Sequence, residues 1–110
     1  MAKSLLLKVE DIKTLIKGQG ACLCTSMITV DGLPVGYMYR DEPEFEEDSG
    51  WRILAGTETD AYMEDPKNGK IYDLNTIANY DSSIIPHLHK PIGTTLERIP
   101  DTDEYRELLE

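Results

Sequence analysis

The residues best suited to chemistry stand together in the middle of the chain. Residues 71–81 place two Asp, two Asn and two Tyr among apolar neighbours. Burying amides and carboxylates is unfavourable unless they are hydrogen-bonded, so these side chains must either cross-link the backbone or face a partner. A capping and hydrogen-bonding network is the favoured interpretation, and a polar pocket for a small molecule or peptide is the alternative. The residues concerned are Tyr72, Asp73, Asn75, Asn79, Tyr80 and Asp81.

A second cluster is acidic. Six of the eight residues 41–48 are Asp or Glu, which favours a solvated loop because so many like charges cannot pack. The spaced oxygen ligands of a calcium loop are missing, so calcium is disfavoured. An aromatic anchor inside a charged rim suits a protein-binding edge. The candidate partner-binding residues are Asp41, Glu42, Glu44, Phe45, Glu46, Glu47 and Asp48.

Metal and catalytic chemistry have less support. Cys22 and Cys24 lie two apart, as do His87 and His89, and together they offer the ligand types of a two-Cys two-His zinc site. Zinc ligand pairs are usually separated by at least two residues, so reduced core thiols are the favoured interpretation and no cofactor is expected.

No Ser or Cys nucleophile stands in a recognisable catalytic motif. A hydrolase using Asp73 or Asp81 as its base is the least favoured hypothesis, and we expect a protein that is not an enzyme.

The composition fits one soluble domain over residues 1–110 with a formal net charge of −10. That charge disfavours binding to nucleic acid or anionic membranes and favours encounter with a basic protein. No apolar run is long enough to cross a bilayer, and the Leu triplet at 5–7 is too short for a signal peptide, so a cytoplasmic location is expected.

Periodicity predicts an α+β fold, a small and mainly antiparallel sheet with short helices on one side. The four-three-four spacing of Leu5, Val9, Ile12 and Ile16 predicts an N-terminal amphipathic helix that ends at Gly18 and Gly20. We expect a hairpin of strands 21–30 and 35–40, and further strands at 51–55, 70–72 and 93–99. We also expect a helix within 57–65 capped by Thr57 or Thr59, a helix capped by Asp73, and a helical turn from Ser83 with Pro86 in its first turn. Residues 100–110 form an acidic tail.

Three blocks in order carry a family resemblance. They are residues 35–40, the segment 49–56 with Trp51 and Arg52, and residues 71–81 continuing through Pro86. Over about residues 20–98 this order resembles a bacterial family of domains of unknown function grouped with the immunity proteins of polymorphic toxin systems, immunity family thirty-three. Ser82 stands where that family's pattern often has Pro.

The resemblance implies a small α+β protein that neutralises a cognate toxin by direct binding. We therefore expect the acidic residues at 41–48 and 58–65 to meet a toxin domain, while the block at 71–81, with Trp51 and Arg52, forms the polar network or pocket. Homodimer formation through an exposed sheet edge remains an open alternative.

Overall fold

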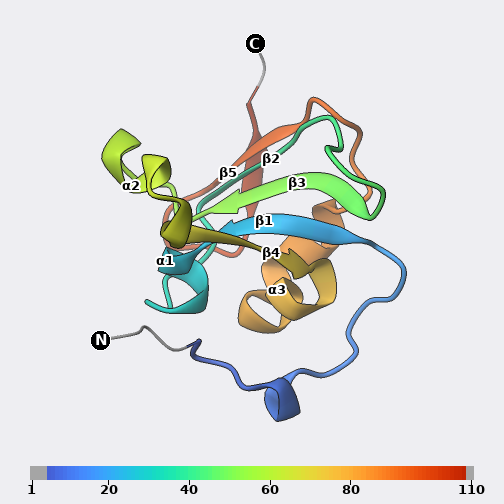
Figure 1. Cartoon of the computed structure of the whole chain (residues 1–110). Coiled ribbons are helices and arrows are strands. Elements are labelled where there is room, and N and C mark those ends of the chain that lie inside the picture. The colour runs from blue at the N-terminus through green and yellow to red at the C-terminus, as the bar shows by residue number, and fades with distance from the viewer. Residues whose placement is uncertain (1–4, 109–110) are drawn as a thin grey trace.

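Six short strands form one mixed sheet in the order β4-β1-β3-β2-β5-β6 (Figure 1). The computed structural model describes residues 5–108. Strands β1 and β3 run parallel, and the other four neighbouring pairs are antiparallel, which confirms the predicted α+β class. The strands are β1 (Ala21–Thr25), β2 (Tyr37–Arg40), β3 (Asp48–Leu54), β4 (Gly69–Asp73), β5 (Thr95–Arg98) and β6 (Tyr105–Glu107).

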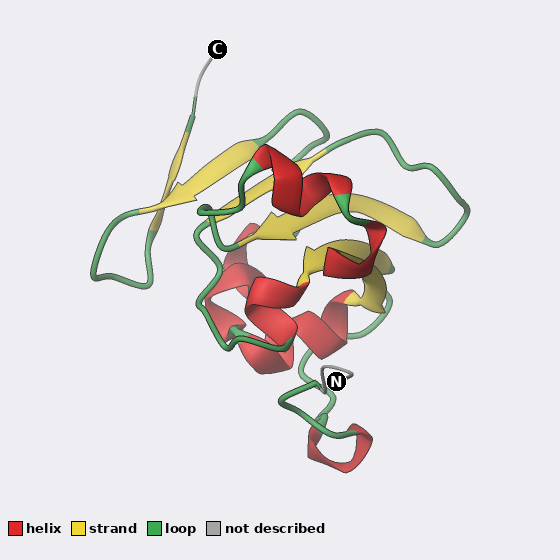
Figure 2. Ribbon diagram, turned by 60° about the vertical axis from the view of Figure 1, so that its left-hand side comes forward, coloured by secondary structure: helices red, strands yellow, loops and turns green. Residues whose placement is uncertain are grey.

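The helices are short, and most of them gather on one side of the sheet (Figures 1 and 2). They are α1 (Ser26–Thr29), α2 (Asp60–Glu64) and α3 (Leu74–Tyr80), with 3₁₀ helices η1 (Val9–Asp11), η2 (Pro66–Asn68) and η3 (Ser82–His87). No helix within residues 5–108 is long and apolar enough to cross a membrane.

The core lies between this face of the sheet and helices α1, α3 and η3. Alternate strand residues point inward, so Cys22, Cys24, Met38 and Ile53 are fully buried. Trp51 is also fully buried, and its indole N–H donates to the carbonyl oxygen of Leu88 at 3.1 Å, which ties β3 to the end of η3. The inward residues of the sheet and helices form one contiguous hydrophobic cluster.

Helix α3 forms as the sequence predicts. The Asp73 carboxylate accepts a hydrogen bond from the backbone N–H of Asn75 at 2.9 Å, which is the arrangement of an N-cap. Leu74, Ile77 and Ala78 are buried against the core, as expected from their spacing. Thr59 caps α2 in the same way, by accepting from the N–H of Tyr62.

The turn after α3 differs from the prediction. Asp81 caps η3 by accepting from both the N–H and the hydroxyl of Ser83, so the helix begins at Ser82. Pro86 therefore lies inside η3, and its expected place in the first turn was wrong.

The predicted N-terminal amphipathic helix was also wrong. In residues 5–20 the only helical element is the single 3₁₀ turn η1, and Val9, a predicted core residue, is 90% exposed. Backbone N–H groups that a helix would use internally donate instead to side chains of α3, as described below. The apolar stripe finds no surface that covers all of it, so the helix has no packing to stabilise it.

The predicted hairpin of residues 21–30 with 35–40 does not form. Strand β3 lies between β1 and β2, and the chain leaves the sheet after Thr25 to form α1. Val35 stands outside the ladder because its N–H donates to Asp81 at 2.9 Å and its carbonyl accepts from Arg98 at 2.6 Å. The acidic tail likewise contains a strand, β6, paired with β5, so β5 is not the last strand.

Candidate functional site

The acidic loop, residues 41–47, connects the antiparallel strands β2 and β3 as a hairpin and is exposed along its whole length. Its five carboxylate residues are all exposed, and Phe45 is 36% exposed among them. Asp48 differs from the others because it is only 6% exposed and begins β3. The structure therefore brings six of the seven candidate partner-binding residues to the surface and places Asp48 inside.

Asp48 makes a buried ion pair with Arg52. The two guanidinium nitrogens of Arg52 donate to the two carboxylate oxygens of Asp48 at 2.9 and 2.8 Å, a bidentate geometry. The same carboxylate accepts from the backbone N–H groups of Glu44 and Gly50. These hydrogen bonds, led by that of Arg52, hold the pKa of Asp48 well below its usual range. Asp48 is thus an internal brace for the loop and not part of its exposed surface.

Close backbone packing fixes the base of the acidic loop. Gly50 has φ +90°, and a Cβ there would lie 2.1 Å from the carbonyl oxygen of Asp41. Gly20 has φ +84°, and a Cβ there would lie 2.6 Å from the carbonyl oxygen of Glu47. Only glycine fits at either position without a backbone shift. The backbone is therefore closely packed at both ends of the acidic loop, below its exposed carboxylates.

Beside this loop, the outer face of the sheet carries a shallow cleft of about 240 Å³. Tyr39 and Arg52 face each other across β2 and β3, and Met63 of α2 closes the other side. The rings of Tyr37 and Tyr39 lie 5.9 Å apart on this face. Asp41 and Glu44 contribute to its lining, so the cleft joins an apolar floor to the acidic loop. The sequence did not single out this cleft because strands far apart in the chain form it.

On the other side of the molecule, the asparagines of α3 bind the N-terminal segment. Asn79 accepts from the N–H of Lys13 at 2.9 Å and donates to its carbonyl oxygen at 2.8 Å. Asn75 donates to the same carbonyl and accepts from Leu15 and Ile16. The face proposed as an open polar pocket is therefore occupied by this chain's own backbone.

Both tyrosines of the block, residues 71–81, also make hydrogen bonds. The hydroxyl of Tyr80 accepts from the N–H of Leu7 at 3.2 Å. The hydroxyl of Tyr72 donates to the side chain of Thr29 at 3.3 Å, which joins β4 to α1. Burial raises the pKa of the Tyr72 hydroxyl. These contacts are consistent with a cross-linking role for the block.

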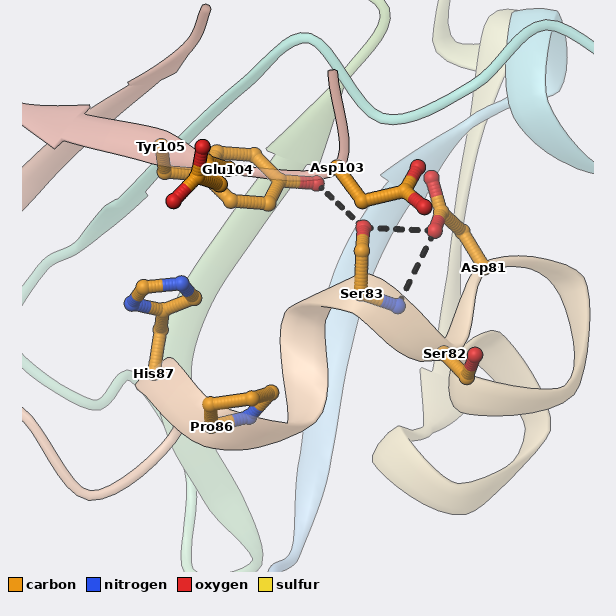
Figure 3. Close-up of a pocket in the computed structure, with 8 residues that line it drawn as sticks. All are labelled: Asp81, Ser82, Ser83, Pro86, His87, Asp103, Glu104 and Tyr105. Atoms are coloured by element: carbon orange, nitrogen blue, oxygen red, sulfur yellow. Dashed lines mark hydrogen bonds between the residues drawn. The ribbon is translucent and has the colours of Figure 1, made fainter.

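Asp81 belongs to a polar network that sequence reasoning did not find. Its carboxylate pairs with Arg98 of β5 and accepts from the Ser83 hydroxyl at 2.6 Å. Figure 3 shows Ser83 between Asp81 and Tyr105, and the Ser83 and Tyr105 hydroxyls lie 2.9 Å apart. No spacing in the sequence connects Asp81 with Arg98, because the fold alone brings η3 and β5 together.

A cleft of about 490 Å³ opens beside this network, lined also by His87, Asp103 and Glu104. The Ser83 hydroxyl hydrogen-bonds with Asp81, Arg98 and Tyr105, so it links η3 to β5 and β6. His87 packs edge-on against the Tyr105 ring at 5.1 Å, and burial lowers its pKa. It shares no hydrogen bond with Ser83, so the structure does not pair His87 with Ser83 as base and nucleophile.

The cysteines lie in the hydrophobic core, as the favoured interpretation expects. Cys22 and Cys24 are each 1% exposed, and burial raises the pKa of the Cys22 thiol to about 12 and that of Cys24 further. Within residues 5–108, no three or more His, Cys, Asp or Glu side chains are placed to hold a metal ion, so the structure does not bring the cysteines together with His87 and His89 as ligands.

Comparison with protein families connects this architecture to the resemblance noted in the sequence. A family model described as the Immunity protein Imm33 domain matches residues 22–109, which include the acidic loop, Trp51 and Arg52, all of α3, and the Asp81–Arg98 network. Neither the comparison with curated proteins nor that with solved structures gave a match. Because the family model covers most of the sequence, this chain belongs to the Imm33 family of immunity protein domains.

Proposed function

We propose that this protein neutralises a cognate bacterial toxin by binding it directly, and that the acidic loop, residues 41–47, forms part of the interface. Membership of an immunity protein family supports a protein partner. The choice of surface rests on the loop itself, which has five exposed carboxylates and Phe45 and is closely packed at both ends. Binding through fixed charges requires little ordering of the loop, which favours affinity.

The charge of the molecule supports a basic partner. The formal net charge is −10, and the loop concentrates acidic residues on one projection. Complementary charges speed association and disfavour wrong partners. Tyr39 lines the neighbouring cleft, and its ring can make a cation–π contact with an Arg or Lys side chain of the partner. Asp41 and Glu44, which also line the cleft, can neutralise the charge of that side chain. An interface that extends from the loop into this cleft therefore combines steering with specific contacts.

The acidic residues at 58–65 divide into two groups. Glu58 accepts hydrogen bonds from the N–H groups of Ala55 and Gly56 and from the hydroxyl of Thr25, so it supports the turn after β3. Asp65 likewise has a structural role, because it caps η2 by accepting from the N–H of Lys67. Asp60 and Glu64 are exposed on α2 and remain candidates for the rim of the interface.

The partner is first isolated with tagged full-length protein from lysate of the native organism, at low and then moderate salt. Association kinetics with the captured toxin domain are then measured for the variant Glu44→Lys, Glu46→Lys, Glu47→Lys. We expect its association rate at low salt to fall by about tenfold or more and its salt dependence to flatten, because the steering charges are removed.

The matched control reverses three other exposed carboxylates, Glu10, Asp31 and Glu104, and so changes the net charge by the same amount. A control that slows association as much as the loop variant would attribute the effect to net charge alone. Unchanged kinetics in the loop variant would remove the acidic loop from the interface, and capture of no basic protein by the folded chain would count against the proposed function.

A further inference from the structure

The six-stranded sheet of residues 5–108 has two edge strands, and β4 is the longer of them (Figure 1). β4 has five residues, whereas β6 at the opposite edge has three. On β6, Arg106 and Glu107 already form ion pairs with Glu97 and Lys90. An edge strand with unpaired main-chain groups is a template for a further strand. The edge formed by β4 is therefore the better template of the two.

Alternate residues of β4 direct their main-chain N–H and C=O groups away from β1. The N–H of Leu74 donates to the carbonyl of Gly20 at 2.9 Å, and this bond continues the antiparallel ladder of β4 with β1. In such a ladder, hydrogen-bonded pairs alternate with pairs whose main-chain groups point outward. Gly69, Ile71 and Asp73 are therefore the residues of β4 whose main-chain groups point out from the edge of the sheet.

The side chains at this edge are accessible, and the central one is apolar. Ile71 is 56% exposed and pairs with Leu23 of β1, which is itself only half-buried. Both residues lie on the face of the sheet opposite the one that carries Cys22 and Cys24 into the core. Covering Ile71 with another apolar side chain would remove this surface from water, which favours pairing at the edge.

The charges at the β4 edge are balanced, unlike those of the molecule as a whole. The formal net charge is −10, but at this edge Lys67 and Lys70 stand with Asp65 and Asp73. Within the described residues, neither lysine takes part in an ion pair. Two copies of the chain can therefore meet at β4 without the like-charge repulsion that the acidic loop would impose.

We propose that two copies of this chain form a dimer by antiparallel pairing of their β4 strands about a two-fold axis at Ile71. This register sets Ile71 against its own copy and Gly69 against Asp73 of the second copy, so all three outward-pointing residues find main-chain partners. It also brings Lys67, two residues before Gly69, toward that aspartate. A shift by two residues would instead oppose the two Lys70 side chains or set Ile71 against Asp73, which disfavours both alternatives.

Such a dimer is weak, and it doubles the exposed sheet face. A pairing of two five-residue strands buries less than the about 1,200 Å² of a stable interface, so we expect a dissociation constant on the order of 10 to 100 µM. An axis perpendicular to the sheet keeps both clefts beside the acidic loops on the same face of one continuous sheet. The inference concerns another surface than the acidic loop and does not depend on the proposed function.

Sedimentation velocity of the full-length protein, from about 1 to 300 µM in about 0.3 M salt, measures the association. We expect the mean mass to rise with concentration from the 12.4 kDa of one chain toward twice that value. Ile71→Lys should raise the dissociation constant at least about tenfold, because two like charges would meet on the axis. Ile92→Lys, at another exposed apolar side chain outside the strands, is the control and should associate like wild type.

A cysteine cross-link tests the register. Directly opposed residues of a hydrogen-bonded antiparallel pair have Cα atoms about 5.5 Å apart, within reach of a disulfide. Ile71→Cys should therefore give a disulfide-linked dimer on mild oxidation, while Lys70→Cys, which is offset from its own copy, should not. Cys22 and Cys24 are each 1% exposed and stay out of the reaction.

The fluorescence of the buried Trp51 shows that each variant is folded. A wild-type protein that stays monomeric at every concentration would overturn the proposal. So would an Ile71→Lys variant that associates like wild type, an Ile92→Lys variant that is weakened equally, or faster cross-linking of Lys70→Cys than of Ile71→Cys.

Discussion

At the scale of single residues, carboxylates of one chemical type have different roles. Asp48 braces the acidic loop through Arg52, Asp73 caps α3, and Asp81 joins η3 to Arg98 of β5. Glu42 and Glu46 share the same chemistry but stay in solvent. Position relative to backbone N–H groups and arginines, and not residue type, separates the structural acids from those free to meet a partner.

Replacing Asp48 with Asn should lower the free energy of unfolding at pH 7 by about 3 kcal/mol, because the buried Arg52 keeps its charge and loses its bidentate partner, with only the exposed carboxylate of Glu44 left at 3.9 Å. The pKa of Asp48 lies well below its usual range in the folded protein. Its contribution is therefore complete above pH of about 4 and lost as the pH falls below that, so the difference from wild type should shrink in acid.

Urea unfolding at pH 7 and pH 3, followed by Trp51 fluorescence, measures both effects. Glu42→Gln, in the exposed part of the same loop, serves as the control and should leave stability unchanged. An Asp48→Asn variant as stable as wild type at pH 7 would show that the ion pair does not brace the loop.

At the scale of elements, the two sides of α3 have different roles. One side of the helix buries Leu74, Ile77 and Ala78 in the core, and on the other Asn75 and Asn79 bind the N-terminal segment. Strands β2 and β3 perform a similar double role, since their inner residues join the core and their outer residues form the cleft beside the acidic loop. Each of these short elements thus contributes residues both to the core and to the surface of the protein.

Asp73→Ala should lower the free energy of unfolding by about 1 kcal/mol, because the N–H of Asn75 loses its capping acceptor. Asp73→Ser restores a capping oxygen and should recover most of that loss. Chemical denaturation followed by circular dichroism measures the three proteins. If both variants were as stable as wild type, the cap would not stabilise α3; if Asp73→Ser were as unstable as Asp73→Ala, the loss would not come from the cap.

At the scale of the whole molecule, one core unites elements from the whole length of the domain. The cluster includes residues of β1, β2, β3, α3, η3 and β5, so none of these elements has a separate hydrophobic interior. The N-terminal segment, residues 5–17, is the exception, because it contributes only Ile16 at the margin of the cluster. The acidic loop and the side of α3 that binds this segment are both supported by this single core.

We therefore expect residues 21–108 to unfold in one cooperative transition. Trp51 is the only tryptophan and reports on the centre of the core, while far-ultraviolet circular dichroism reports on the sheet and helices. The two signals should give the same midpoint in urea. Separate midpoints would show that part of the sheet unfolds independently of the core.

Local patterns determined a definite part of this protein. Asp73 followed by Leu74, Ile77 and Ala78 was enough to predict a capped helix, because caps and helical faces depend on neighbours within one or two turns. The acidic loop and the family were also evident from the sequence, although whether the loop is a binding surface stays a prediction.

Only the tertiary structure decided the rest. The stripe of Leu5, Val9, Ile12 and Ile16 is compatible with a helix, but the backbone of this segment bonds to side chains of α3 instead, and the first half of the stripe stays exposed. In the sequence Asp48 resembles the other acids of the loop, and only the folded β2–β3 hairpin brings the Arg52 side chain to it. Which strand lies between β1 and β2, and that Asp81 meets Arg98, follow from packing between distant segments, and no spacing along the chain encodes such contacts.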